Sequence, residues 1–497
     1  MSKKLEPNVL EFKREAAAKQ PKLVRPKGDR RVQKAPEFPQ YSKTLLVIFK
    51  SKADKWRDDF FKRTAACMTM YDFTYESYQQ PSKIRKRETL QELVRLVEST
   101  EMAKKFDARM KLELFRIINA HIFRLLPKLP RVSDPAGWNP AEDTQGCDPA
   151  WVHTVMAYTL LVSCLKNFHE GDLRTLVSRK FTRLLLGNFE SADPREREIL
   201  RVCAHRIYTK FIHLRKFIIT DITYTLLRNI YESEQQVGIP ELLEIMACII
   251  SGFQVPLKPV NTTFFSRVLL PLHKCNNYNQ FYEQLQYCVV RYIEKDPELS
   301  STALVALVKY WPIHNNKKQQ QMLLEFESVF RLTSAEHFNR PKVRKAAFSH
   351  MARLMKSEHV AIAMRAFSFW NDKYFLNLVI QFTNETMDYL VPNVAEATYH
   401  WNLVIRQTAE SLLTILQEMN PEHYDKLYEK WQKKRPPQKI VGQRAPPKSP
   451  ARKSVTLSSK KSRSTNLSKT SRTAKTTSAK SQSLSPNTQS PKSKSPK

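Results

Sequence analysis

The hydrophobic residues between about residue 41 and residue 432 recur with the 3.6-residue period of an amphipathic α-helix. One stripe with the spacing i, i+3, i+4, i+7, i+8 consists of Leu285, Cys288, Val289, Tyr292 and Ile293. Similar stripes run through residues 105–125, 150–167, 197–212, 216–232, 240–251, 263–272, 361–370 and 403–419. Convincing strand alternation is found nowhere, so the pattern predicts an all-α protein.

Some helix ends can also be predicted from the sequence. Asp193-Pro194 begins a charged helix, because proline is favoured at the first helical position. Further along, Ser300 or the serine after it can cap a helix whose apolar face continues to Trp311, and Pro312 ends it. Both segments therefore predict short, separately capped helices.

The length of this helical segment argues against a single bundle. Domains normally split beyond ~250–300 residues, whereas a stack of helix pairs can continue. At about 40–47 residues per two-helix unit, residues 41–432 predict a curved HEAT-like solenoid of roughly eight units. The Lys/Pro/Glu-rich residues 1–40 and the Ser/Lys-rich residues 433–497 cannot bury enough apolar surface to fold, so we expect disordered arms there.

The net charge of +34 first suggests a nucleic-acid partner. Of this charge, +18 lies in residues 433–497, +6 in residues 1–40 and only +10 in the predicted solenoid. A basic helical-repeat protein that binds RNA or DNA remains the alternative function, and it requires basic or aromatic residues recurring along one face. We expect nucleic acid to bind only non-specifically, through the tail.

The chain lacks the motifs of common catalytic and cofactor sites. Its 8 glycines never cluster into a phosphate-binding loop, and its 7 cysteines include no Cys-x-x-Cys pair. There is no His-Glu-x-x-His sequence, and no apolar run approaches the ~18 residues of a membrane span. The sequence predicts a soluble intracellular protein with no catalytic residues, no metal, no cofactor and no membrane association.

A candidate peptide-binding site lies in the middle of the chain. Ile245 and Ile249 are i, i+4 neighbours on one predicted helix. If the preceding helix places His205, Arg206 and Tyr208 opposite them, an apolar slot edged by cations results. Such a slot suits an extended peptide with two aliphatic anchors and acidic or phosphorylated positions, because arginine binds these anions bidentately. The alternative is that the isoleucines are core residues beside an ordinary surface edge.

Several short runs, in order along the chain, carry a family resemblance. They are Asp193-Pro194-Arg195-Glu196-Arg197, His205-Arg206-Ile207-Tyr208, Gly238-Ile239 with Glu241-Leu242-Leu243-Glu244-Ile245, Leu270-Pro271-Leu272-His273-Lys274, Tyr287-Cys288-Val289-Val290, Glu294-Lys295-Asp296, Lys309-Tyr310-Trp311-Pro312, Phe369-Trp370-Asn371 and His400-Trp401-Asn402. Together they closely resemble the B-prime regulatory subunits of protein phosphatase 2A, from about Leu45 to about Trp431.

The resemblance implies a curved HEAT-like solenoid without enzymatic activity, docked on the phosphatase scaffold (A) and catalytic (C) subunits in a heterotrimer. A concave groove would bind short Leu-x-x-Ile-x-Glu motifs of substrate or adaptor proteins, often strengthened by phosphorylation. The motif-binding residues of the family fall here on His205, Arg206, Tyr208, Arg215, Glu244, Ile245, Ile249 and Lys258.

Three positions depart from the family pattern. Ile219 stands where a second arginine is usual, Asn261 where a histidine is usual, and Val202 where a threonine is usual. Each lost charge-assisted hydrogen bond costs about 1.5–3 kcal/mol. We therefore expect the aliphatic anchors to be retained and the attraction for downstream acidic residues of the motif to be weaker.

The C-terminal tail carries its own candidate signals. Its candidate phosphorylation sites are the Ser-Pro serines Ser449, Ser485, Ser490 and Ser495. Its candidate nuclear import signal consists of Lys433, Lys434 and Arg435, so we expect the protein in both cytoplasm and nucleus. Four phosphates would offset about a third to nearly half of the tail's charge, giving a charge-tunable tether. The alternative is a solvated linker with incidental sites.

Overall fold

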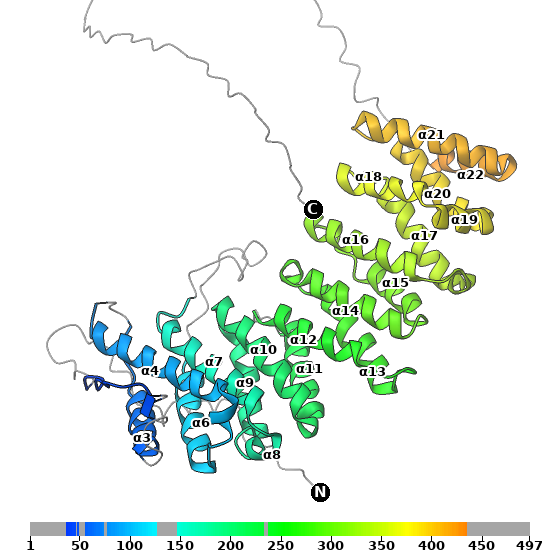
Figure 1. The fold of residues 1–497 in the computed structure, drawn as a ribbon. Coiled ribbons are helices and arrows are strands. Elements are labelled where there is room, and N and C mark those ends of the chain that lie inside the picture. The colour runs from blue at the N-terminus through cyan, green and yellow to red at the C-terminus, as the bar shows by residue number, and fades with distance from the viewer. Residues whose placement is uncertain are drawn as a thin grey trace, which may run out of the picture. The chain divides into compact units, whose positions relative to one another are not determined.

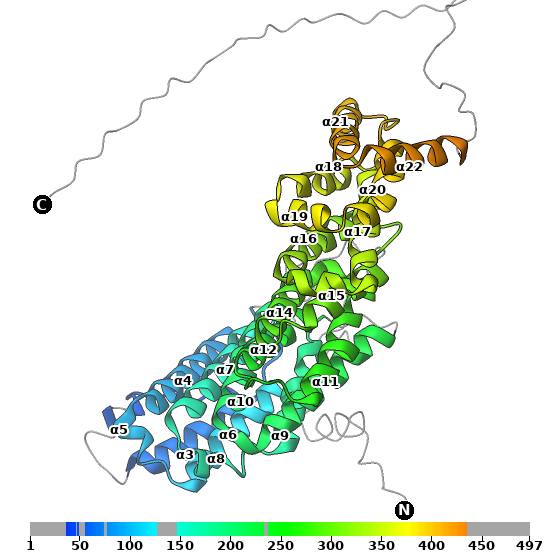
Figure 2. The same cartoon turned by 90° about the vertical axis from the view of Figure 1, so that its right-hand side faces the viewer.

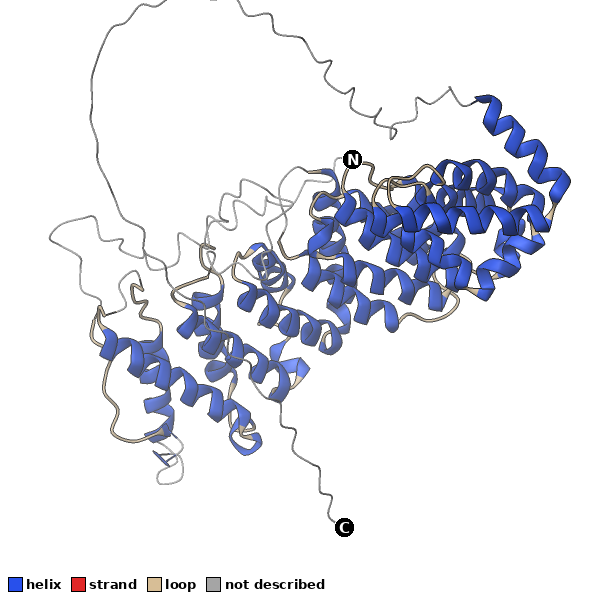
Figure 3. Cartoon of the chain, turned by 90° about the horizontal axis from the view of Figure 1, so that it is seen from above, coloured by secondary structure: helices blue, strands red, loops and turns tan. Residues whose placement is uncertain are grey.

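The computed structural model describes residues 36–45, 47–48, 55–73, 77–126, 147–232 and 237–434. Within these ranges every regular element is a helix, and no β-strand is present (Figure 3). The prediction of an all-α protein is confirmed. None of the helices in the described part of the chain is both long enough and apolar enough to cross a membrane.

The elements follow one another with short connections, most of them only a few residues long. The α-helices are α3 (Lys55–Cys67), α4 (Gln80–Glu98), α5 (Thr100–Ala103), α6 (Ala108–Ile122), α7 (Trp151–Asn167), α8 (Glu170–Leu173), α9 (Arg179–Gly187), α10 (Pro194–Lys210), α11 (Arg215–Tyr231), α12 (Ile239–Ser251), α13 (Pro259–Phe264), α14 (Tyr282–Lys295), α15 (Leu299–Lys309), α16 (Asn316–Leu332), α17 (Pro341–Met355), α18 (Val360–Ser368), α19 (Lys373–Gln381), α20 (Thr383–Ala397), α21 (Leu403–Met419) and α22 (Pro421–Lys434). The short 3₁₀- and π-helical segments are η2 (Asn188–Glu190), η3 (Ile212–Leu214), η4 (Phe265–Leu269), η5 (Leu270–Lys274), η6 (Tyr278–Gln280), η7 (Ala335–Asn339) and η8 (Phe369–Asn371).

Most of the helices stack in two layers, and each of these packs on the next one of its own layer (Figures 1 and 2). The first layer consists of α4, α7, α10, α12, α14, α16, α18 and α21. The second layer consists of α9, α11, η5, α15, α17, α20 and α22. Because successive chain segments alternate between the layers, each contacts mainly its neighbours, as in a helical-repeat solenoid. The solenoid prediction is confirmed.

The predicted apolar stripes become the buried faces of the helices. In α14 the buried residues are Leu285, Cys288, Val289, Tyr292 and Ile293, the five residues predicted from the spacing. Burying a large apolar side chain contributes about 1.5–3 kcal/mol, so such stripes hold the layers together. Residues 263–272, predicted to form one α-helical stripe, do not form a single α-helix. The chain changes there from α13 to the π-helical segment η4 and then to the 3₁₀-helical segment η5. Pro271 lies in η5 and lacks the N–H that an α-helix needs there.

The two predicted helix ends have different outcomes. α10 begins as predicted, with the Asp193 carboxylate accepting the Arg195 N–H at 3.0 Å and Pro194 in the first turn. The predicted cap of α15 is wrong, since the helix begins at Leu299 and the Ser300 hydroxyl donates to Pro297 O at 2.6 Å. The side chain that could cap the helix is instead buried inside its first turn.

The packed chain begins before the predicted boundary at residue 41. Phe38 is buried, and its backbone N–H donates to Ser82 Oγ at 3.1 Å. The Tyr71 hydroxyl donates to Pro36 O at 3.1 Å. The last residues of the predicted N-terminal arm therefore pack against the start of the solenoid.

At the other end, α22 continues to Lys434. Lys433 and Lys434 of the predicted import signal are therefore helical, and the Lys433 ammonium lies 3.3 Å from Glu429 Oε2. Outside the described residues lie Arg435 and the candidate phosphorylation sites Ser449, Ser485, Ser490 and Ser495.

Candidate functional site

The predicted site residues gather where α10 and α12 lie side by side in the first layer (Figures 1 and 2). α10 carries His205, Arg206 and Tyr208, and α12 carries Glu244, Ile245 and Ile249. Arg215 is the first residue of α11, which follows α10 after the short segment η3. Lys258 lies farther along the chain, where it precedes α13 as the N-cap.

The two isoleucines are core residues. Ile245 is 1% exposed and Ile249 is 3% exposed, and both belong to the continuous apolar core. This burial is what the core-residue alternative predicts for the two side chains. In any peptide site they form the floor, because a ligand reaches only the margin of each side chain.

The rim above this floor is organised by Arg201, which the sequence analysis did not identify. Its Nε lies 3.0 Å from Glu244 Oε2, and its guanidinium also pairs with Glu198. Gln284 of α14 donates to the other oxygen of Glu244 at 3.4 Å. Arg201 precedes His205 by four residues and so lies on the same face of α10. This i, i+4 spacing is the sequence signal from which Arg201 could have been identified as a site residue. Both carboxylate oxygens of Glu244, which is predicted to bind the motif, therefore already have a partner within the chain.

Two basic side chains beside this ion pair have no hydrogen-bond or ion-pair partner in the described part of the chain. The His205 imidazole and the Arg206 guanidinium are half-buried, and neither forms a hydrogen bond or ion pair with the described part of the chain. Burial raises the pKa of the neighbouring Cys203 thiol to about 12, and the charge of Arg206 opposes this shift. An unpaired, half-buried guanidinium favours an anionic ligand, because such a bond is charge-assisted and partly shielded from water.

The Arg215 side chain binds backbone carbonyl groups in the last turn of α10. Its Nε donates to Tyr208 O at 3.0 Å, and one Nη donates to Thr209 O at 3.1 Å. The guanidinium carbon lies 5.2 Å from the centre of the Tyr208 ring, and burial of that ring raises the pKa of its hydroxyl. Two of the five guanidinium N–H groups are thus used internally, leaving three for a ligand.

The remaining predicted positions lie around this core arrangement. Ile219, one turn after Arg215, is half-buried and packs against the core, and Val202 is half-buried in α10. Asn261 donates its backbone N–H to Lys258 O at 2.8 Å. The exposed Lys258 ammonium forms no hydrogen bond or ion pair within the described ranges. Among the described residues, therefore, no hydrogen bond or ion pair of the Lys258 ammonium joins it to the α10–α12 site.

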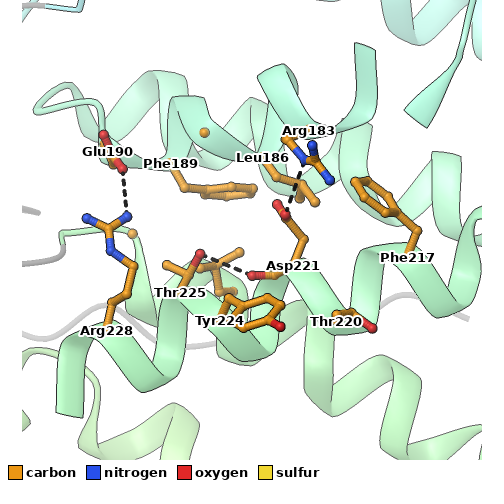
Figure 4. Close-up of a pocket in the computed structure, with 13 residues that line it drawn as sticks. Arg183, Leu186, Phe189, Glu190, Phe217, Thr220, Asp221, Tyr224, Thr225 and Arg228 are labelled. Atoms are coloured by element: carbon orange, nitrogen blue, oxygen red, sulfur yellow. Dashed lines mark hydrogen bonds and ion pairs between the residues drawn. The ribbon is translucent and has the colours of Figure 1, made fainter. Parts of the chain in front are cut away.

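A separate hollow of about 470 Å³ lies against α9, η2 and α11 (Figure 4). Arg183 Nε lies 3.9 Å from Asp221 Oδ1, and Arg228 Nη1 lies 3.4 Å from Glu190 Oε1. Burial raises the pKa of Asp221, and Arg183 opposes the shift. The other residues that line the hollow are Leu186, Gly187, Phe189, Phe217, Thr220, Tyr224, Thr225, Gly238 and Leu242. At 100° per residue the α11 members of this set face away from Arg215 and Ile219, so the hollow is distinct from the predicted site.

The described residues contain no candidate metal cluster, and the Cys67 thiol is buried. No group of three or more His, Cys, Asp or Glu side chains among them could hold a metal ion. Burial raises the pKa of the Cys67 thiol to about 12, which keeps it protonated and unreactive at neutral pH.

Comparison with known proteins identifies the family. The family model for the protein phosphatase 2A regulatory B subunit (B56 family) matches residues 46–446. The alpha isoform of the 56 kDa regulatory subunit of serine/threonine-protein phosphatase 2A from Mus musculus is 34% identical over 375 residues, covering 74% of this chain and 75% of that protein. A 57 kDa regulatory subunit of the same phosphatase from Arabidopsis thaliana, the B' alpha isoform, is 33% identical over 413 residues, covering 81% and 82%. The chain therefore belongs to the B56 family of protein phosphatase 2A regulatory B subunits, and it is a phosphatase regulator rather than an enzyme.

Proposed function

We propose that this protein docks on the scaffold and catalytic subunits of protein phosphatase 2A and recruits substrates through the surface between α10 and α12. The ligands are short Leu-x-x-Ile-x-Glu motifs, with or without phosphorylation. The observation that carries the proposal is the pair of half-buried basic side chains, His205 and Arg206, which form no hydrogen bond or ion pair with the described chain. Membership of a family of regulatory subunits supports the association with a phosphatase.

In this proposal the anions of the motif bind the cations of the rim. Arg206 and His205 donate to the acidic or phosphorylated positions, and the free N–H groups of Arg215 add to them. The aliphatic anchors lie over α12, where Ile245 and Ile249 supply the floor. Because isoleucine occupies position 219, no second arginine follows Arg215 on that face, and we expect a modest contribution from downstream acidic residues.

The cellular distribution is part of the same proposal. The basic cluster Lys433, Lys434 and Arg435 supports residence in the nucleus as well as in the cytoplasm. Phosphorylation of the tail serines would reduce the positive charge beside this cluster. Mass spectrometry of the protein from cells tests this point, since unmodified serines at all four Ser-Pro pairs would remove the charge-tuning role.

A calorimetric titration of the full chain with a Leu-x-x-Ile-x-Glu peptide tests the groove. Arg206→Glu should weaken binding by about tenfold or more, since it loses a charged hydrogen bond and adds a like charge. Lys345→Glu is the matched control, because Lys345 is an exposed cation on α17 and the charge change is the same. Equal affinities of the two variants would reject the groove. Replacing the isoleucines is a poorer test, because their burial makes the loss of stability large.

A further inference from the structure

Three loops form one edge of the C-terminal half of the solenoid. They are residues 310–315, 356–359 and 398–402, and each connects a second-layer helix to a first-layer helix. The connected pairs are α15 with α16, α17 with α18, and α20 with α21. We call these loops, together with the first turn of α21, the Trp401 edge.

Hydrogen bonds link the three loops, the first two of them through α16. The Gln319 side chain donates to Ile313 O at 2.9 Å, and the next residue, Gln320, lies 3.5 Å from His359 Nε2. The Trp401 indole N–H donates to Glu358 O at 3.0 Å. The first two loops are thus both bonded to neighbouring residues of α16, and the second loop is bonded directly to the third, so the three lie along one edge of successive repeats.

The Trp401 edge exposes large apolar side chains. Ile313 is 78% exposed and Trp401 is 70% exposed. Leu403 and Val404, in the first turn of α21, are exposed as well. The chain at the start of α10, in contrast, buries polar side chains rather than exposing apolar ones. There the buried Glu196 is paired with Arg124. Grouped exposed apolar residues on a folded chain mark an interaction surface.

The exposed indole is held rigidly. His400 Nδ1 accepts the Asn402 N–H at 3.0 Å, so its Nε2 carries the proton and donates to Ser357 O at 3.1 Å. The imidazole fixed in this way stacks on Trp401 with ring centres 5.4 Å apart. With its N–H also bonded, the indole loses little conformational freedom when a partner covers it. Rigid, exposed tryptophans are typical anchors of protein interfaces.

The charges around the edge indicate the chemistry of the partner. Lys309, Lys317 and Lys356 are exposed beside or within the loops. Glu358 is the acidic residue within them. The Trp401 edge thus combines exposed apolar side chains with exposed lysines, and such a surface is complementary to an acidic protein surface with an apolar pocket.

We propose that the Trp401 edge docks on the phosphatase core, with the Trp401 ring seated in an apolar pocket of an acidic surface of that core. The inference rests on the proposed function, because it assigns the position at which the core binds. It also leaves the α10–α12 surface, on helices earlier in the chain, available for substrate motifs.

Binding of the full-length chain to a purified scaffold–catalytic dimer tests the inference, with the dissociation constant measured by biolayer interferometry. Trp401→Ala should raise the dissociation constant by about tenfold or more, as expected for a central interface tryptophan. Lys317→Glu combined with Lys356→Glu should weaken binding and reduce its dependence on salt. Ile380→Ala is the matched control, because Ile380 is 62% exposed on α19, outside the edge, and should bind as the wild type does.

Unchanged melting temperature and motif-peptide affinity of Trp401→Ala exclude a folding defect as the cause. If the wild type binds the core and Trp401→Ala binds equally well, the inference is overturned and the proposed function stands. If the wild type does not bind the core at all, both fail. Light scattering that finds a wild-type dimer dispersed by Trp401→Ala would overturn the inference in favour of a second copy of the chain.

Discussion

The substitution Gly238→Ala tests whether the start of α12 packs so closely on Phe189 that no side chain fits at position 238. Gly238 immediately precedes α12, and an added Cβ would lie 2.4 Å from Phe189 O and 2.7 Å from Phe189 Cβ. The first contact is with backbone, and Phe189 is itself buried, so rotation of a side chain cannot relieve it. The start of α12 or the η2 segment has to move.

The expected magnitude follows from the size of this clash. Overpacking a well-packed site by one methyl group typically costs about 1–3 kcal/mol. Replacing glycine by alanine at an N-cap adds a few tenths. We therefore expect the melting temperature to fall by about 2–6 °C, given the scaling for proteins larger than a small domain. Affinity for motif peptides should fall too, because α12 carries Glu244.

Gly252→Ala at the other end of α12 is the matched control. An added Cβ there would lie 3.4 Å from Ile249 O, an ordinary contact, and the backbone φ of −84° suits any residue. Reduced freedom of the unfolded chain should leave its melting temperature unchanged or higher. Differential scanning fluorimetry and peptide titration of both variants provide the comparison. Equal melting temperatures for the two variants would refute the steric reasoning.

Three further substitutions test other parts of the structure. Lys86→Met should raise the free energy of unfolding at pH 7 by about 1–2 kcal/mol, because burial lowers the pKa of Lys86 to about 8 and the gain exceeds the lost bond to Thr69 O. The pKa of Lys86 in the folded protein lies below the unfolded value of 10.5, so the wild type gains stability as the pH rises from 8 to 10.5. Urea unfolding across this range should therefore show that the stability advantage of Lys86→Met disappears. Arg197→Ala should cost about 3–5 kcal/mol in the same assay, because it leaves the buried Glu241 carboxylate without its partner at 2.8 Å. A smaller loss for Arg197→Ala than for Arg197→Ala combined with Glu241→Gln would contradict that explanation. Arg206→Gln should reduce the preference for Glu over Gln in the motif by about tenfold, measured as a ratio of peptide affinities, and an unchanged ratio would exclude Arg206 from acid recognition.

The helical pattern could be predicted because burial follows local spacing. The five residues that α14 buries are those with the predicted i, i+3, i+4, i+7, i+8 separation. The start of α15 could not be predicted in the same way, because Ser300 can cap a helix or hydrogen-bond inside its first turn. Which of the two occurs depends on how the preceding loop packs, and that is a tertiary property.

In the candidate site, too, some features follow from local sequence and others depend on how the helices pack. Arg206 and His205 could be identified from the sequence, and the structure leaves their side chains unpaired beside α12 within the described chain. The almost complete burial of Ile245 could not be predicted, because a face of α12 can turn toward a groove or toward the core. The role of Arg201 could not be predicted either, because it depends on Glu244 of another helix, which lies 3.0 Å away. Pairings between helices depend on their packing and leave little trace in local spacing.

The most direct test of the central claim is the rate at which a reconstituted heterotrimer dephosphorylates a tethered substrate. One phosphopeptide carries a Leu-x-x-Ile-x-Glu motif and a second has the motif scrambled, and kcat/KM is measured for both. With the wild-type chain the motif should raise kcat/KM by about tenfold or more, because tethering increases the local substrate concentration. Arg206→Glu should abolish this advantage, and Lys345→Glu should keep it. An equal advantage with the wild type and with Arg206→Glu would contradict substrate recruitment through this surface.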